Sequence, residues 1–216
     1  MTDLQTQLAA ELAELDKKVA PLSGHRISLK GKVFSMPDGK TSPGPINAVI
    51  LDWRNVNTFY KGAYNPAKVE APVCFALAKN IPDLAPSPNC SDPQNKTCED
   101  CHWNQWNSAP GGGNAKACKN QIRIAIVPPD AKVGTPPWTI DLAPSSIAAF
   151  NNLVNTIRDQ LGKLPLQIQV TIDFDPNADY PKLTFADPEP LPEKLIEMMF
   201  ELRKASQSSL EKEPGT

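Results

Sequence analysis

A polar segment over residues 81–120 interrupts the apolar patterning of this 216-residue chain. The segment is rich in Pro, Asn, Asp, Gln and Gly, and it holds four of the five cysteines. A stretch of this length without secondary structure is uncommon inside a compact domain unless something else fixes it. The sequence therefore predicts a long loop that is held by a bound metal ion, and the rest of the chain must fold around it.

The cysteines of this segment have a spacing that indicates a metal site. Cys98 and Cys101 form a Cys-x-x-Cys turn, which lets two thiolates reach one tetrahedral ion, and Cys90 and Cys118 lie on either side of it. Most structural zinc sites have two close pairs, whereas only one pair is close here. We expect Cys90, Cys98, Cys101 and Cys118 to bind zinc, with an iron–sulfur cluster as the chemical alternative. Cys74 lies in an apolar run and is interpreted as a small buried side chain.

The N-terminus and the hydropathy of the chain indicate a protein of the cytoplasm. The first residues lack a basic stretch leading into an apolar one, and no run approaches the roughly 18 apolar residues that span a bilayer. We therefore expect no membrane association and a reducing compartment, where clustered cysteines are more often metal ligands than disulfides. The net charge of -2 gives no global attraction to a polyanion, so a nucleic-acid surface would have to be a local concentration of Lys and Arg.

Outside the loop, the periodicity of apolar residues predicts an α+β domain over residues 24–186. Alternation of apolar and polar residues, or a short apolar run, predicts strands at 25–33, 46–53, 73–78, 121–127, 138–142, 166–174 and 180–185. A helix is expected from Ser145 or Ser146 to Leu161, with Gly162 as its stop. This order favours a strand-rich small barrel, similar to an oligonucleotide-binding (OB) fold, or a curved antiparallel sheet with peripheral helices.

The two ends of the chain are predicted to be peripheral. Residues 1–20 have leucines at helical spacing and are expected to form an amphipathic helix, which either packs on its own domain or joins two chains in a homodimer. Residues 187–205 are expected to contain a C-terminal helix, a second candidate for a dimer contact. The Ser/Glu/Lys-rich tail, residues 206–216, is expected to be flexible because it has little apolar content.

Aromatic residues and cations are interleaved around the cysteine loop and the first strands, as single-stranded nucleic acid requires. Bases stack on flat rings while Lys and Arg neutralise phosphates. The alternative is that the aromatic residues belong to the core and the lysines to a solvated face. The candidate nucleic-acid-binding residues are Arg26, Lys30, Lys32, Trp53, Arg54, Tyr60, Lys61, Trp103, Trp106, Lys116, Lys119 and Arg123.

The chain offers little that indicates an enzyme. It has two histidines, His25 and His102, no glycine-rich phosphate loop and no recognisable nucleophile motif. A four-cysteine site has no open coordination position, so the expected metal is structural and not catalytic. We therefore predict that the protein is not an enzyme.

The order of several motifs resembles a group of tailed-bacteriophage proteins, over most of residues 24–186. The most specific motif is Cys98-Glu-Asp-Cys101-His-Trp-Asn104 followed by Lys116-Ala117-Cys118-Lys119. The others are Met36-Pro37-Asp38-Gly39, Val49-Ile50-Leu51-Asp52-Trp53, Ala71-Pro72-Val73-Cys74-Phe75-Ala76-Leu77 and Pro144-Ser145-Ser146.

This resemblance implies a role in phage DNA metabolism within the host cytoplasm, including single-stranded-DNA binding by an oligonucleotide-binding barrel. The tail from Ser206 is only mildly acidic, which departs from the strongly acidic, partner-recruiting tails of many such binders. The sequence thus predicts sequence-tolerant binding of single-stranded DNA in phage replication or recombination. The alternative is a zinc-stabilised structural or protein-interaction module, such as a virion or host-takeover component.

Overall fold

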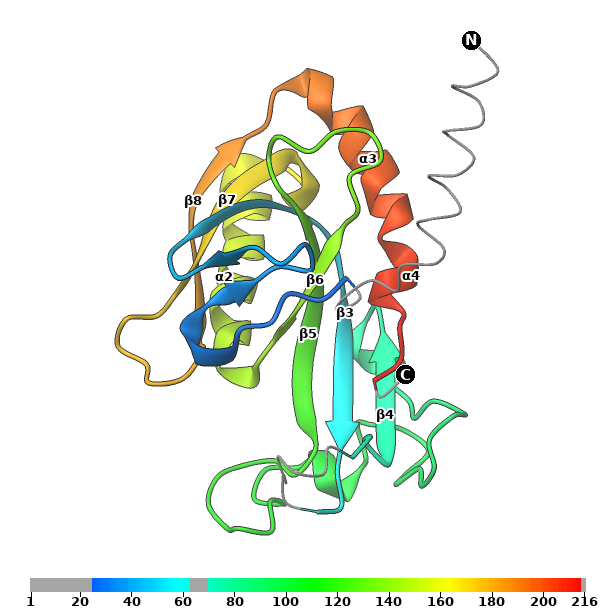
Figure 1. Ribbon diagram of the computed structural model, residues 1–216. Coiled ribbons are helices and arrows are strands. Elements are labelled where there is room, and N and C mark those ends of the chain that lie inside the picture. The colour runs from blue at the N-terminus through cyan, green and yellow to red at the C-terminus, as the bar shows by residue number, and fades with distance from the viewer. Residues whose placement is uncertain (1–24, 63–69, 215–216) are drawn as a thin grey trace, which may run out of the picture.

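The computed structural model describes residues 25–62 and 70–214 of the chain. Figure 1 shows a sheet with helices beside it and a lobe of irregular loops at one end. The amphipathic helix predicted for residues 1–20, and any dimer contact through it, lie outside the described residues.

The sheet is antiparallel throughout, which confirms the predicted α+β class. Its six strands are β3 (Ile46–Phe59), β4 (Cys74–Ala78), β5 (Lys119–Val127), β6 (Trp138–Leu142), β7 (Ile168–Phe174) and β8 (Leu183–Pro190). They follow the order β6-β5-β3-β7-β8, with β4 also paired to β3. Among the described strands, the pairings form an open path that does not join β6 to β8, so the sheet is not closed into the barrel that was one of the two predicted forms.

Strand β3 is fourteen residues long and serves two parts of the sheet. Its first residues, Ile46–Val49, pair with β7, and its last residues, Asn55–Phe59, pair with β4 on the same edge. On its other edge β5 follows it from Val49 to Thr58, with a register shift between Ile50 and Asp52. The far ends of β3 and β5 therefore carry the chain into the lobe (Figure 1).

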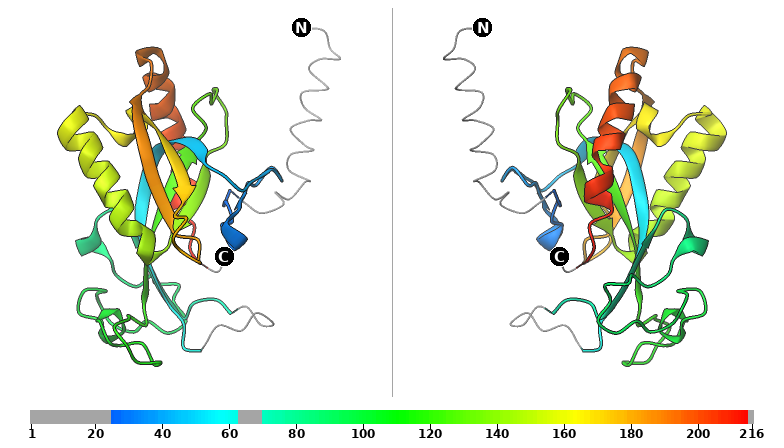
Figure 2. Two further views of the ribbon diagram at one scale, coloured as in Figure 1. Left: turned by 90° about the vertical axis from the view of Figure 1, so that its left-hand side faces the viewer. Right: turned by 90° about the vertical axis from the view of Figure 1, so that its right-hand side faces the viewer.

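Helices cover both faces of the sheet, because the strands are apolar on both sides (Figure 2). The helix α2 (Pro144–Leu161) packs on one face, where Phe150 contacts Trp53 and Phe185 edge-on. Its N-cap is Ala143 and not Ser145 or Ser146, the predicted caps, and it stops at the predicted Gly162, whose φ of 59° is left-handed, as a helix stop requires. On the opposite face lie α3 (Ile196–Ala205) and α4 (Gln207–Leu210).

Two arginines on neighbouring strands connect the C-terminal segment to the sheet. Arg54 and Arg123 are cross-strand partners that are only 2% and 7% exposed. Arg54 donates to Asp52, Gln207 and Glu211, and Arg123 donates to Asp141 and to the main-chain oxygens of Leu210 and Lys212. Buried cations need such partners because an unpaired buried charge is strongly destabilising.

The tail that was expected to be flexible from Ser206 is ordered as far as residue 214. Ser206 and Leu210 are fully buried, and Glu213 accepts hydrogen bonds from Ser87 and Asn89 of the lobe. The tail is ordered because Leu210 is buried against the sheet and because the main-chain oxygens of Leu210 and Lys212 accept hydrogen bonds from Arg123. None of the described helices is long and apolar enough to cross a membrane.

The strand predicted for residues 25–33 is reduced to two isolated pairings. Arg26 pairs with Thr139, Ser28 pairs with Ser35, and a short 3-10 turn spans Lys30–Lys32. Gly31 and Lys32 have positive φ values of 71° and 57°, which are incompatible with an extended strand. The first hairpin instead joins the short strands β1 (Phe34–Ser35) and β2 (Thr41–Ser42).

Burial of Leu210 provides a test of the ordered C-terminal segment. We expect Leu210→Ala to lower the free energy of unfolding by about 2–5 kcal/mol, as is usual for a leucine lost from a core. Leu161→Ala is the matched control, since Leu161 also lies at a helix end but is 37% exposed, and it should cost less than about 1 kcal/mol. Urea unfolding curves measure both values. Equal, small losses would contradict the packing of α4 on the sheet.

Candidate metal centre and nucleic-acid surface

The lobe consists of β4, residues 79–118, and the ends of β3 and β5 that meet them. Its free strand edge is covered, because Ser87 donates a main-chain hydrogen bond to Phe75 of β4 and Asp92 donates one to Val73, the residue before β4. An unpaired strand edge would otherwise be open to other chains. The loop thus completes the sheet at this end and brings residues 87–92 beside β4.

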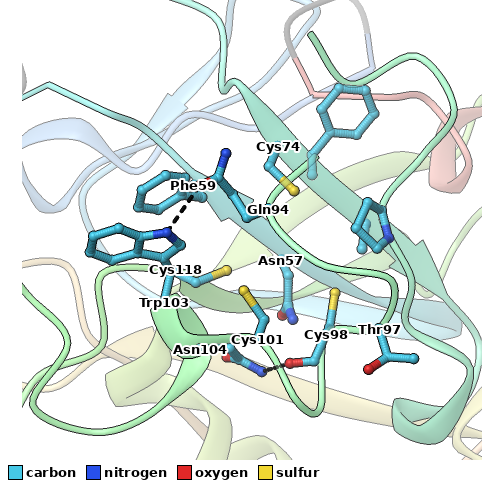
Figure 3. Close-up of a pocket in the computed structure, with 13 residues that line it drawn as sticks. Asn57, Phe59, Cys74, Gln94, Thr97, Cys98, Cys101, Trp103, Asn104 and Cys118 are labelled. Atoms are coloured by element: carbon cyan, nitrogen blue, oxygen red, sulfur yellow. Dashed lines mark hydrogen bonds between the residues drawn. The ribbon is translucent and has the colours of Figure 1, made fainter. Parts of the chain in front are cut away.

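Four cysteines line one small cavity in the lobe. Cys74, Cys98, Cys101 and Cys118 border it, and Figure 3 shows their sulfur atoms around the same space. The cavity measures about 10 Å³, which is room for one water-sized occupant and too little for an organic ligand. The predicted ligands Cys98, Cys101 and Cys118 are therefore brought together in this structure.

Cys90 lies beside this group and does not line the cavity. Its sulfur accepts a hydrogen bond from the Phe75 amide at 3.1 Å and donates one to the Phe75 carbonyl oxygen at 3.2 Å. Cys74, which was expected to be only a small core residue, does line the cavity. The structure therefore gathers five thiols where the sequence analysis expects four.

Burial raises the pKa of three thiols of this cluster, those of Cys74, Cys98 and Cys118. Burial, together with the nearby thiols of Cys98 and Cys101, raises the pKa of Cys118 to about 12. Burial likewise raises the pKa of Cys74 to about 11, and it raises the pKa of Cys98. The low-dielectric surroundings disfavour isolated thiolates, so a cation is needed to stabilise them.

Asparagine side chains connect the cysteine turn to the sheet. Asn120 on β5 donates to Asn57 of β3 at 2.7 Å and to Asn104 at 2.8 Å. Asn104 in turn donates to the main-chain oxygen of Cys98 at 2.7 Å. These residues were not predicted as part of the site, although Asn57, a buried amide near the end of β3 that needs a hydrogen-bond partner, is the signal that could have indicated it.

The donor set and the cavity size fit a zinc ion, whereas the side-chain positions do not form a coordination shell. Within residues 25–62 and 70–214, no group of three or more His, Cys, Asp or Glu side chains is placed to hold a metal ion. The sulfurs border the cavity without converging on one point. Small thiol-lined cavities are nevertheless suited to soft-ligand metals such as zinc.

Several of the predicted nucleic-acid-binding residues have structural roles. Trp53 packs edge-on against Phe150, and Trp103 stacks on Phe59 while its ring N–H donates to Gln94 at 2.9 Å. Arg54 and Arg123 are the buried pair under α4 described above. Lys32 donates to the main-chain oxygens of residues 175 and 178 and so holds the turn before β8.

The remaining candidates are exposed, apart from the partly buried Lys116, and most of them lie on the lobe or directly after β3. Trp106 is 63% exposed with the Lys116 amine 5.4 Å from its ring centre, and Tyr60 is 37% exposed with Lys119 at the same distance. Lys61 lies next to Tyr60 and pairs with Asp92 at 2.6 Å. We call Tyr60, Lys61, Trp106, Lys116 and Lys119 the lobe surface.

Two candidate cations lie away from the lobe loop. Arg26 pairs with Asp141 at 3.1 Å and is largely exposed, and Lys30 is exposed beside the first hairpin. Arg26 is close enough to Tyr60 for its charge to act on the pKa of that phenol, which burial raises.

Comparison of the chain with protein-family models, with curated proteins and with solved structures finds no match. The functional interpretation therefore depends on the residues and geometry of this chain.

The two tryptophans of the loop are expected to differ in their effect on stability. Trp103→Ala should lower the free energy of unfolding by about 2 kcal/mol, less than the 3–5 kcal/mol of a fully buried ring, because Trp103 is only half-buried. Trp106→Ala should change it by less than about 0.5 kcal/mol, because the ring is exposed. Chemical unfolding of both variants makes the comparison, and a larger loss for Trp106→Ala would contradict the assignment.

Proposed function

We propose that this protein binds single-stranded DNA without sequence preference, through the lobe surface. The observation that carries the proposal is the pair of exposed rings, Trp106 and Tyr60, each with a lysine amine over its face. Their lysines are three residues apart at the entrance to β5, so both pairs belong to one region of the lobe. Rings and cations in alternation are the groups that single strands require.

Each pair would exchange its internal contact for contacts with DNA. A base stacks on the exposed ring, which is worth about 1–3 kcal/mol, and the lysine amine moves from the ring to a phosphate oxygen. Every base has a flat face and every nucleotide a phosphate, so such binding tolerates any sequence. Arg26 and Lys30 extend the cationic region of the proposed interface, whereas Arg54, Arg123, Trp53 and Trp103 support it from within.

The proposal includes one zinc ion bound by Cys98, Cys101, Cys118 and a fourth thiolate. Such an ion would close the chain between residue 101 and residue 118, and it would thereby restrict the loop that carries Trp106 and Lys116. A four-sulfur site has no open coordination position, so the proposed role of the metal is structural and no enzymatic activity is proposed.

The resemblance to tailed-bacteriophage proteins supports phage DNA replication or recombination as the setting. In this setting single strands are exposed and need a sequence-tolerant binder. The proposed partner is single-stranded DNA, and the proposed location is the cytoplasm of the bacterial host.

Titration of a fluorescein-labelled dT oligonucleotide tests the DNA-binding proposal. Binding by the full chain should be saturable, and Trp106→Ala or Tyr60→Ala should each weaken it by about 5- to 150-fold, the equivalent of one lost stacking contact. Tyr180→Ala is the matched control, because Tyr180 is also exposed but lies outside the lobe, and it should leave the affinity unchanged. Fluorescence anisotropy measures all four proteins.

The salt dependence of the same titration tests the lysines. The logarithm of the binding constant should fall with the logarithm of salt concentration, and Lys119→Ala should make this slope shallower by about 0.7, the value for one phosphate contact on a single strand. Lys132→Ala removes an exposed lysine from the loop before β6 and should leave the slope unchanged. Absence of binding at low salt by folded protein would refute the proposal and favour the protein-interaction module.

A further inference from the structure

The cluster contains one more thiol than a tetrahedral zinc site uses, and the structure distinguishes the candidates for the fourth position. Three ligands are common to any choice: Cys98 and Cys101 from the turn, and Cys118, which directly precedes β5. The fourth ligand is either Cys90 or Cys74, which are neighbours in the lobe, but only Cys74 borders the cavity.

Strand register places the Cys74 side chain in the cavity. Cys74 pairs with Phe59 and Ala76 pairs with Asn57, so these four side chains lie on one face of the two strands. All four also line the cavity that Cys98, Cys101 and Cys118 border. Figure 3 shows the Cys74 sulfur on the side of the cavity opposite the cysteine turn.

The sulfur of Cys90 lies beside the Cys74 thiol and contacts the main chain of Phe75, whose amide donates a hydrogen bond to it at 3.1 Å. The Cys90 thiol donates to the Phe75 carbonyl oxygen at 3.2 Å, on the edge of β4 that faces away from β3. A zinc-bound sulfur is a thiolate and has no hydrogen to donate, so in this position it would face a carbonyl oxygen across a repulsive contact. Cys90 is therefore suited to anchor residues 87–92 to the strand edge as a neutral thiol.

We propose that Cys74, and not Cys90, is the fourth ligand of the zinc ion, together with Cys98, Cys101 and Cys118. This inference rests on the proposed zinc binding and specifies its ligands. On binding, the four thiols lose four protons to solvent, and the ion with its thiolates carries a net charge of -2. The ion then joins three segments at one point: β4, the cysteine turn and the residue that precedes β5.

Zinc content of cysteine variants tests the inference, with Cys98→Ala as the reference for a lost ligand. The full chain should contain one zinc per molecule after dialysis against a competing chelator. Cys90→Ala should retain it, with affinity lowered by at most about 10- to 100-fold, as for a residue that supports a ligand from outside the shell. Cys74→Val keeps an apolar side chain against Phe59 so that the lobe stays packed, and it should lose zinc to the level of Cys98→Ala.

Cobalt substitution gives a second measurement that does not depend on affinity. The sulfur-to-cobalt charge-transfer absorption grows with the number of bound thiolates, so Cys90→Ala should keep the full intensity and Cys74→Val should lose about a quarter of it. Circular dichroism and unfolding curves confirm that each variant is folded.

The possible failures are distinguishable. A metal-free wild-type chain would refute the zinc proposal itself, and with it this inference. Loss of zinc from Cys90→Ala to the level of Cys98→Ala, or full retention by Cys74→Val, would overturn the assignment of Cys74 while leaving zinc binding intact.

Discussion

The pairing of β3 with three other strands is the interaction on which the rest of this structure depends. Buried main-chain N–H and C=O groups must be paired, and a strand of fourteen residues has too many of them for one short neighbour to satisfy. Strand β7 pairs with its beginning, β4 with its end, and β5 with most of its other edge. The helical part of the molecule and the lobe are thus two regions of one hydrogen-bonded ladder.

The chemistry of the two regions differs because different side chains fill them. Around α2 the core is made of Ile, Leu, Val and Phe, which need no partners. Beneath α4 the sheet carries two buried arginines, whose five-donor groups bind carboxylates, an amide and main-chain oxygens from segments distant in sequence. In the lobe, thiols and hydrogen-bonded asparagines pack beside Phe59 and Trp103, which explains why a polar segment can fold compactly there.

The apolar periodicity of the sequence was sufficient to predict the elements near the middle of the chain. The strands at 46–53, 73–78, 121–127 and 138–142 and the helix α2 form where alternation or a helical stripe indicates them, because burial of one face fixes both patterns. The strand at 25–33 was wrong, because Gly31 and Lys32 adopt left-handed conformations that periodicity does not reveal. The ordered tail was missed because one leucine, Leu210, supplies most of its burial.

The candidate site was predicted by residue type more successfully than by position. The loop cysteines could be selected because their spacing is local, and Cys98, Cys101 and Cys118 do lie together. The place of Cys74 depends on strand register, which the sequence does not specify. A buried arginine and an exposed one look alike in sequence, so Arg54 and Arg123 could not be separated from Lys116 and Lys119. Whether the exposed group contacts DNA stays a prediction.

The continuous ladder between β3 and β5 also determines how the lobe can move. Nine residue pairs connect the two strands, from Val49–Val127 beside the helices to Thr58–Lys119 at the lobe. A hinge between the two regions would have to break these main-chain hydrogen bonds, and the buried Arg54 and Arg123 lie midway along the same stretch. The lobe is therefore a rigid extension of the sheet, and any molecule that docks on it is held at a fixed angle to the helices. Because β3 and β5 run through both regions, a molecule bound to the lobe would also have a defined orientation relative to α2 and α3.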